Sequence, residues 1–325
     1  MMKKLKIGNV SLLIAICLFI AMFVGGSIKY DRFGSVSTIF NLFNDNAYLI
    51  IVATGMTFVL LTGGIDISVA SNLAFTCVLS AFLLDKGWSA LVVIPLVLFI
   101  GTFAGFLMGY CIQVFKIQPF IITLAGLFFL RGMCAVVSTV SIPINNAFYK
   151  SLALSKISFQ IGGSRAKLYY YVFIALAVVL IAWFVLKYTK FGRYVYAVGS
   201  NEVSAELMGI DVKKVKIAVY AISGFSASLG GFVFSLYTLA GYSLQNMGLE
   251  LDAISSAVIG GTLLTGGVGT VIGSMFGVLI QGIIQTIVTY QNLNTWWTKV
   301  TIAALLCFFI VIQRIIAIRA EKKKA

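Results

Sequence analysis

Apolar segments that reach or approach the length needed to cross a lipid bilayer recur along the whole chain. A helix needs about 17–25 mostly apolar residues to span the hydrocarbon core. The ten candidate segments run from about 9 to 27, 47 to 62, 67 to 84, 90 to 113, 119 to 141, 166 to 187, 215 to 240, 252 to 265, 268 to 290 and 297 to 318. Only 10% of the 325 residues are charged, against about 25% in a soluble domain. We therefore predict an all-α fold, a polytopic membrane helical bundle of about ten transmembrane helices, formed by residues 1–325 as a single domain.

Pairs of glycines separate the second apolar segment from the third and the eighth from the ninth. Because glycine weakens a helix, we expect broken helices near 63 and 266, each being either two crossings or one crossing and a re-entrant piece. The sequence Leu60–Gly64 recurs as Leu263–Gly267. Duplicated halves are common in transporters, but a match of five residues between apolar segments also fits coincidence, and both explanations stay open.

The basic residues predict how the chain is oriented. The net charge is +14. With a cytoplasmic N-terminus, ten crossings place fifteen Lys and Arg inside and eight outside, with Arg131 left within a span. This distribution follows the positive-inside rule. We therefore expect both termini in the cytoplasm, an uncleaved first helix rather than a signal peptide, and no nucleic-acid partner.

The composition also excludes several kinds of chemistry. The chain has no histidine, which removes Ser-His-Asp triads and the zinc sites that depend on histidine. No phosphate-binding loop or other catalytic motif is present in the sequence. The five cysteines all lie in apolar runs and are interpreted as reduced packing residues. We expect no catalytic residue, no metal and no cofactor.

Two polar stretches are long enough to matter, one outside at about 142–167 and one inside at about 188–214. The inner stretch predicts a short helix from Asn201 to Met208, capped by Asn201 and ended by Gly209. A short helix in a cytoplasmic loop is a docking surface by its geometry, although a simple amphipathic connector explains the same pattern.

Charged groups inside membrane spans are costly and therefore informative. Asp66 follows a double glycine, so it either lines the translocation pathway or gate, or caps the next span through the amide near Ser68. Ser68, Asn72 and Phe75 are further candidates for the pathway. Arg131 lies near the predicted midplane, where it either contacts substrate or forms a structural salt bridge or carbonyl clamp.

Other polar and small residues have simpler interpretations. We expect Glu250 and Asp252 to cap the eighth span or to lie at the outer mouth. The small residues from Ser223 to Gly231 favour close helix packing. Sugar stacking on a phenylalanine such as Phe128 is less expected than packing.

Three stretches together resemble the permease subunits of bacterial ribose-type sugar ABC importers. They are residues 55–69, 199–210 and 250–270. The similarity extends from about residue 40 to 315. Residues 294–299 look most like one of the two permeases of a galactofuranose importer.

This resemblance implies a permease domain without ATPase activity in the bacterial cytoplasmic (inner) membrane. Its expected partners are a second permease chain (identical or a sister), an ABC ATPase subunit, and a periplasmic or tethered binding protein that delivers a monosaccharide, galactofuranose-like or ribose-like. The resemblance also implies that the loop at 188–214 couples the permease to the ATPase. The residues that correspond to the family's coupling pattern are Glu202, Ala205, Glu206 and Gly209, and the pattern is only loosely kept.

Two alternatives of different kinds remain at this stage. An ion-coupled secondary transporter needs buried carboxylates, and only Asp66 is a good candidate. The same ABC architecture carrying a nucleoside, an autoinducer or an amino acid fits the residues as well as a sugar permease does.

Overall fold

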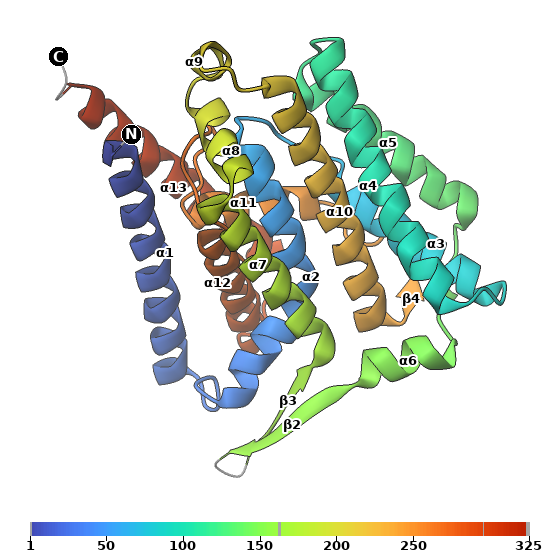
Figure 1. The fold of residues 1–325 in the computed structure, drawn as a ribbon. Coiled ribbons are helices and arrows are strands. Elements are labelled where there is room, and N and C mark those ends of the chain that lie inside the picture. The colour runs from blue at the N-terminus through green and yellow to red at the C-terminus, as the bar shows by residue number, and fades with distance from the viewer. Residues whose placement is uncertain (1, 162–163, 295, 323–325) are drawn as a thin grey trace.

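The structure is a computed structural model that describes residues 2–161, 164–294 and 296–322 (Figure 1). The helices are α1 (Met2–Lys29), α2 (Val36–Leu61), α3 (Val69–Asp85), α4 (Ala90–Val114), α5 (Pro119–Val137), α6 (Ala147–Leu154), α7 (Tyr170–Tyr188), α8 (Lys190–Ser200), α9 (Glu202–Leu207), α10 (Val212–Thr238), α11 (Leu249–Ile259), α12 (Val271–Tyr290) and α13 (Trp296–Lys322). The strands are β1 (Ile142–Pro143), β2 (Lys156–Ile161), β3 (Ser164–Tyr169) and β4 (Ala240–Gly241).

The two ends of the bundle carry different elements. The start of α1 and the last turn of α13 lie at the same end as α8 and α9, at the top of Figure 1. The β2–β3 hairpin and α6 lie at the opposite end. We call these the α9 end and the hairpin end.

Seven helices in the described part of the chain are long and apolar enough to cross a membrane, namely α1, α2, α4, α5, α7, α10 and α12. The ten predicted segments each overlap a helix, but two of these helices, α3 with 17 residues and α11 with 11, are too short by this measure. Helix α13 has 27 residues, and within it Trp296–Val311 forms a shorter apolar segment. An 11-residue helix is about 16 Å long, roughly half of the hydrocarbon thickness. The chain is thus a multi-pass helical protein, and ten crossings remain a prediction.

The predicted all-α fold misses the strands. In the outer stretch, β2 pairs antiparallel with β3, from Lys156 opposite Tyr169 to Ile161 opposite Ser164. Polar and apolar residues alternate along Lys156–Ile161, which is the period of a strand with two different faces. The alternating pattern of a strand was therefore present in the sequence, but long apolar runs alone do not reveal it.

Helix α10 lies against α2, α3 and α4 and forms the centre of the bundle. The predicted small-residue face is buried there, including Ser223, Gly224 and Ser228. Opposite it, α4 carries three glycines spaced four residues apart, Gly101, Gly105 and Gly109, which lie on one side of a helix. A Cβ at Gly105 would lie 2.4 Å from the carbonyl oxygen of Tyr220 and 2.9 Å from the Cα of Gly224. The two helices therefore approach each other backbone to backbone, as small residues allow in membranes.

We expect Gly105→Ile to destabilise the bundle by about 1–3 kcal/mol or more, because the added carbons would overlap backbone atoms that cannot turn away. The measurement is the thermal unfolding midpoint of the detergent-purified protein. Gly132→Ile in α5 is the matched control, because a Cβ at Gly132 meets no atom within 4 Å. Equal midpoints for the two variants would contradict the packing described for α4 and α10.

Candidate functional site

The predicted coupling loop folds into two helices, α8 and α9. As predicted, Asn201 caps α9, where its side-chain oxygen accepts a hydrogen bond from the amide of Ser204 at 2.8 Å. Gly209 follows α9 with a φ of +78°, which a residue with a side chain rarely adopts. Ala205 is fully buried and points back into the bundle. The short helix was anticipated, whereas α8 was not.

The exposed side of α9 carries apolar side chains among acidic and polar ones. Val203, Leu207 and Met208 are exposed to 67%, 85% and 67%. Glu206 is exposed beside them and forms no ion pair in the described residues. Glu202 differs, because its carboxylate lies 2.6 Å from the ammonium of Lys216 in α10. The two glutamates predicted to act in coupling therefore differ, because Glu202 joins α9 to α10 and Glu206 faces away from the bundle.

Helix α8 connects this surface to the glycine breaks. A Cβ at Gly199 would lie 1.7 Å from the carbonyl oxygen of Leu61 and 2.7 Å from the amide nitrogen of Gly267. Leu61 ends α2 and accepts a hydrogen bond from the amide of Gly267 at 2.9 Å. The two copies of the Leu-Leu-Thr-Gly-Gly sequence thus contact each other, and the end of α8 packs on both.

A second contact holds α8 in this place. The hydroxyl of Tyr196 donates a hydrogen bond to the carbonyl of Gly269 at 2.8 Å. Burial raises the pKa of Tyr196 to about 12, so the hydroxyl keeps its proton and remains a donor at neutral pH. Helices α8 and α9 therefore form a connection from the surface of the α9 end to the turn that precedes α12.

Asp66 is fully buried between the end of α2 and the start of α3. One carboxylate oxygen accepts hydrogen bonds from the amide and the hydroxyl of Ser68 at 3.0 and 2.6 Å, and the other accepts one from the hydroxyl of Ser223 at 2.7 Å. The predicted bond to the Ser68 amide is confirmed, but Asp66 is not the helix cap that was expected, because α3 begins at Val69 and its N-cap residue is Ser68. These contacts join the turn before α3 to α10, and a role of Asp66 in a pathway or gate stays a prediction.

The other pathway candidates on α3 are also packed inside the bundle. The side-chain amide of Asn72 donates to the carbonyls of Gly101 and Gly224 at 3.1 and 3.2 Å, so it joins α4 to α10. Phe75 packs in a cluster with Leu130 and other apolar residues of α3 and α5. The structure brings Asp66 and Ser68 together, whereas Phe75 lies in an apolar cluster of its own.

Arg131 contacts backbone carbonyls, which was one of the alternatives expected for it, and the two acidic residues of α11 lie near the start of that helix. One guanidinium nitrogen of Arg131 donates to the carbonyls of Ser243 and Gln245 at 2.7 and 2.9 Å, which is a carbonyl clamp on the loop after β4. Glu250 and Asp252 lie in the first turn of α11, where the helix dipole favours negative charge. Asp252 also forms an ion pair of 2.6 Å with Lys299.

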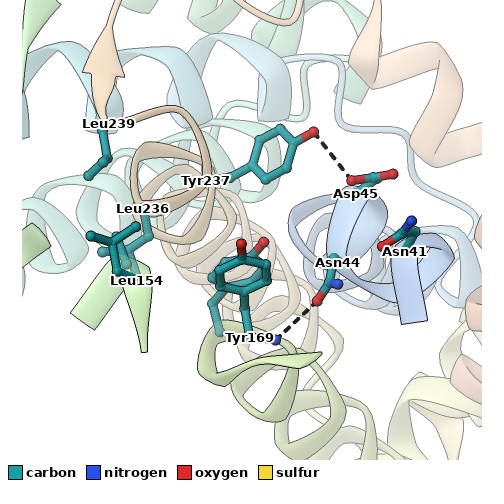
Figure 2. A pocket seen from close by; sticks show the side chains of 10 residues that line it. Asn41, Asn44, Asp45, Leu154, Tyr169, Leu236, Tyr237 and Leu239 are labelled. Atoms are coloured by element: carbon teal, nitrogen blue, oxygen red, sulfur yellow. Dashed lines mark hydrogen bonds between the residues drawn. The ribbon is translucent and has the colours of Figure 1, made fainter. Parts of the chain in front are cut away.

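A cavity of about 340 Å³ opens near the hairpin end between α2, α6, α10 and the start of α7. Figure 2 shows Asn41, Asn44 and Asp45 on one side and Tyr237 and Tyr169 opposite them. The hydroxyl of Tyr237 points to the carboxylate of Asp45, with 3.3 Å between the oxygens. This cavity was not predicted from the sequence, because the second span was expected to start at residue 47, which left these polar residues outside it.

The seven long apolar helices fit a multi-pass membrane protein. The chain belongs to the family described as branched-chain amino acid transport system / permease component, whose model matches residues 38–310. The resemblance to ribose-type sugar ABC permeases is thus confirmed for the family. The chain is a permease subunit and not an enzyme, and the ATPase of such transporters is a separate subunit.

Three relatives match nearly the full length. The inner membrane ABC transporter permease protein YjfF of Escherichia coli is 47% identical over 319 residues, covering 98% of this chain and 96% of that protein. The fructose import permease protein FruG of Bifidobacterium longum is 36% identical, covering 98% of this chain and 95% of that protein. The ribose import permease protein RbsC of Haemophilus influenzae is 36% identical, covering 88% of this chain and 87% of that protein. No solved structure matches the chain significantly.

Proposed function

We propose that this chain is a permease subunit of an ATP-driven ABC importer that carries a monosaccharide across the bacterial cytoplasmic membrane. Relatives named for the import of ribose and fructose support a monosaccharide. A galactofuranose-like substrate is the finer proposal, and it rests on the resemblance of residues 294–299. The working transporter would contain a second permease chain, identical or a sister, two ATPase subunits and a sugar-binding protein.

The observation that carries the proposal is the placement of α9. Its exposed apolar edge lies at the end of the bundle that also holds the start of α1 and the last turn of α13. We infer that this end is cytoplasmic, that both termini lie there, and that the ten predicted segments each traverse the bundle. This orientation agrees with the excess of basic residues on that side.

Helix α9 can couple ATP hydrolysis to transport, because one part of it is exposed and another part is attached to α10. We infer that Glu206, Leu207 and their exposed neighbours contact the ATPase subunit, while Glu202 fixes the helix to α10 through Lys216. Closure of the ATPase dimer on ATP would then move α9 and, through α8, the turns at Leu61 and Gly267. Rocking of the two permease chains provides alternating access.

The test of this proposal is the ATPase rate of the full complex in lipid nanodiscs, with and without the sugar-loaded binding protein. We expect stimulation with the wild-type chain. In the double variant Glu202→Ala, Glu206→Ala, we expect the chain to fold, because both side chains are exposed, but stimulation to fall about tenfold. Stimulation equal to the wild type would remove both residues from coupling.

A further inference from the structure

The cavity near the hairpin end has a lining that suits a small polyhydroxylated molecule. Ligand pockets usually measure about 300–1,000 Å³, so about 340 Å³ lies at the small end of that range. A second cavity, beside Asp252 and Lys299, holds about 200 Å³. The larger of these two cavities has room for a compact ligand.

The polar wall of the cavity comes from one face of α2. Asn41, Asn44 and Asp45 are spaced three and four residues apart, so their side chains lie together on a helix. Both polar atoms of the Asn44 side chain already form hydrogen bonds within the chain. The amide nitrogen donates to the carbonyl of Lys167 at 2.8 Å, and the oxygen accepts from the amide of Tyr169 at 3.1 Å. These bonds join β3 to α2, so Asn41 and Asp45 are the side chains of this wall that can bind a ligand.

The opposite wall is aromatic. The rings of Tyr169 and Tyr171 stack with centroids 5.4 Å apart and planes inclined by 8°. Tyr237 meets Tyr171 edge to face at 6.5 Å. Sugars need both kinds of wall, since their hydroxyls pair with carboxylates and amides while their C–H faces pack on aromatic rings.

The cavity is open to the outside rather than sealed in the core. Asn41 and Asp45 are exposed, and Tyr237 is exposed to 45%. An exposed carboxylate facing lipid would be costly, so this mouth faces water. The hairpin end is the outer end in the proposed orientation. The mouth of the cavity therefore opens to the side of the membrane from which substrate arrives.

The geometry points to an outer monosaccharide subsite in this cavity, with Asp45 and Asn41 binding sugar hydroxyls and Tyr169 and Tyr237 packing on the ring, while the buried Tyr171 supports Tyr169 from behind. Tyr237 also orients Asp45 through its hydroxyl. This inference rests on the proposed function and adds a place where the permease itself holds the sugar. Specificity would then not reside in the binding protein alone.

The experiment is saturation-transfer NMR on the full transporter complex in nanodiscs, without the binding protein, titrated with D-ribose, D-fructose and D-galactose. We expect saturable binding of at least one sugar to the wild type. Asp45→Asn removes the charge that accepts the hydroxyl bonds, and we expect roughly tenfold weaker binding, since a hydrogen bond to a charged group typically contributes at least that factor. Tyr237→Phe keeps the ring and removes only the hydroxyl, and we expect a smaller loss.

Asp31→Asn is the matched control, because Asp31 is an exposed carboxylate between α1 and α2 that lies outside the cavity lining. Binding that is absent in the wild type, or equally strong in Asp45→Asn and Asp31→Asn, would overturn the subsite. Sugar uptake by the wild-type complex separates the two claims. If the complex takes up sugar but no binding to the cavity is detected, only the proposal of a subsite is wrong. If the complex takes up none of the sugars, the proposed function itself is wrong.

Discussion

Replacing Gly199 by alanine is expected to lower ATP-driven uptake at least tenfold. The added methyl group would lie 1.7 Å from the carbonyl oxygen of Leu61, far inside van der Waals contact. Its neighbours are backbone atoms of two turns, so no side chain can rotate away to make room. Such overpacking typically costs about 1–3 kcal/mol, occasionally more. Helix α8 must therefore move off the turns, and α9 loses its rigid connection to them.

The measurement is uptake into proteoliposomes alongside the ATPase rate of the same complex. We expect the Gly199→Ala complex to keep an ATPase rate that no longer responds to the binding protein. Gly132→Ala is the control, because its methyl group would meet open space and uptake should match the wild type. Normal uptake by Gly199→Ala would show that the contact of α8 with the turns has no part in transport.

Leu207→Asp is expected to prevent the ATPase subunit from binding. Leu207 is exposed to 85% on α9, and a central apolar anchor of an interface commonly contributes about 2 kcal/mol or more. A loss of that size weakens binding by about thirtyfold, before the cost of burying a new charge is added. The folded chain should be unaffected, because the side chain contacts solvent in the free permease.

The measurement is the amount of ATPase subunit that copurifies with an affinity-tagged permease. Leu244→Asp provides the comparison, since Leu244 is also an exposed leucine, at 54%, but lies in the loop that follows β4. We expect Leu244→Asp to retain the ATPase subunit and Leu207→Asp to lose it. Equal recovery with both variants would mean that the apolar edge of α9 is not the docking surface.

Local features of the fold were predictable from the sequence. The ten apolar segments each fall on a helix, and the cap at Asn201 and the turn at Gly209 were placed correctly. These features depend on residues within one or two turns of each other. The β2–β3 hairpin is also local. It was not predicted, although polar and apolar residues alternate along Lys156–Ile161 as they do in a strand.

The site itself depends on contacts between distant segments, and those could not be predicted. The bond from Ser223 to Asp66 joins residues 157 positions apart. The packing of Gly199 on Leu61 requires α8 to fold back onto the bundle. A single sequence shows which residue types are costly in a membrane, but not which of them meet. Asp66 was therefore recognised as important, while its serine partner on α10 was not.

The measurement that tests the central claim most directly is uptake of radiolabelled ribose, fructose and galactofuranose into proteoliposomes that contain this chain with its partner subunits. Three conditions are compared: enclosed ATP with the binding protein, enclosed ATP without it, and an ion gradient without ATP. We expect uptake of one of these sugars only when ATP and the binding protein are both present. Uptake under the ion gradient without ATP would contradict the account and identify a secondary transporter instead.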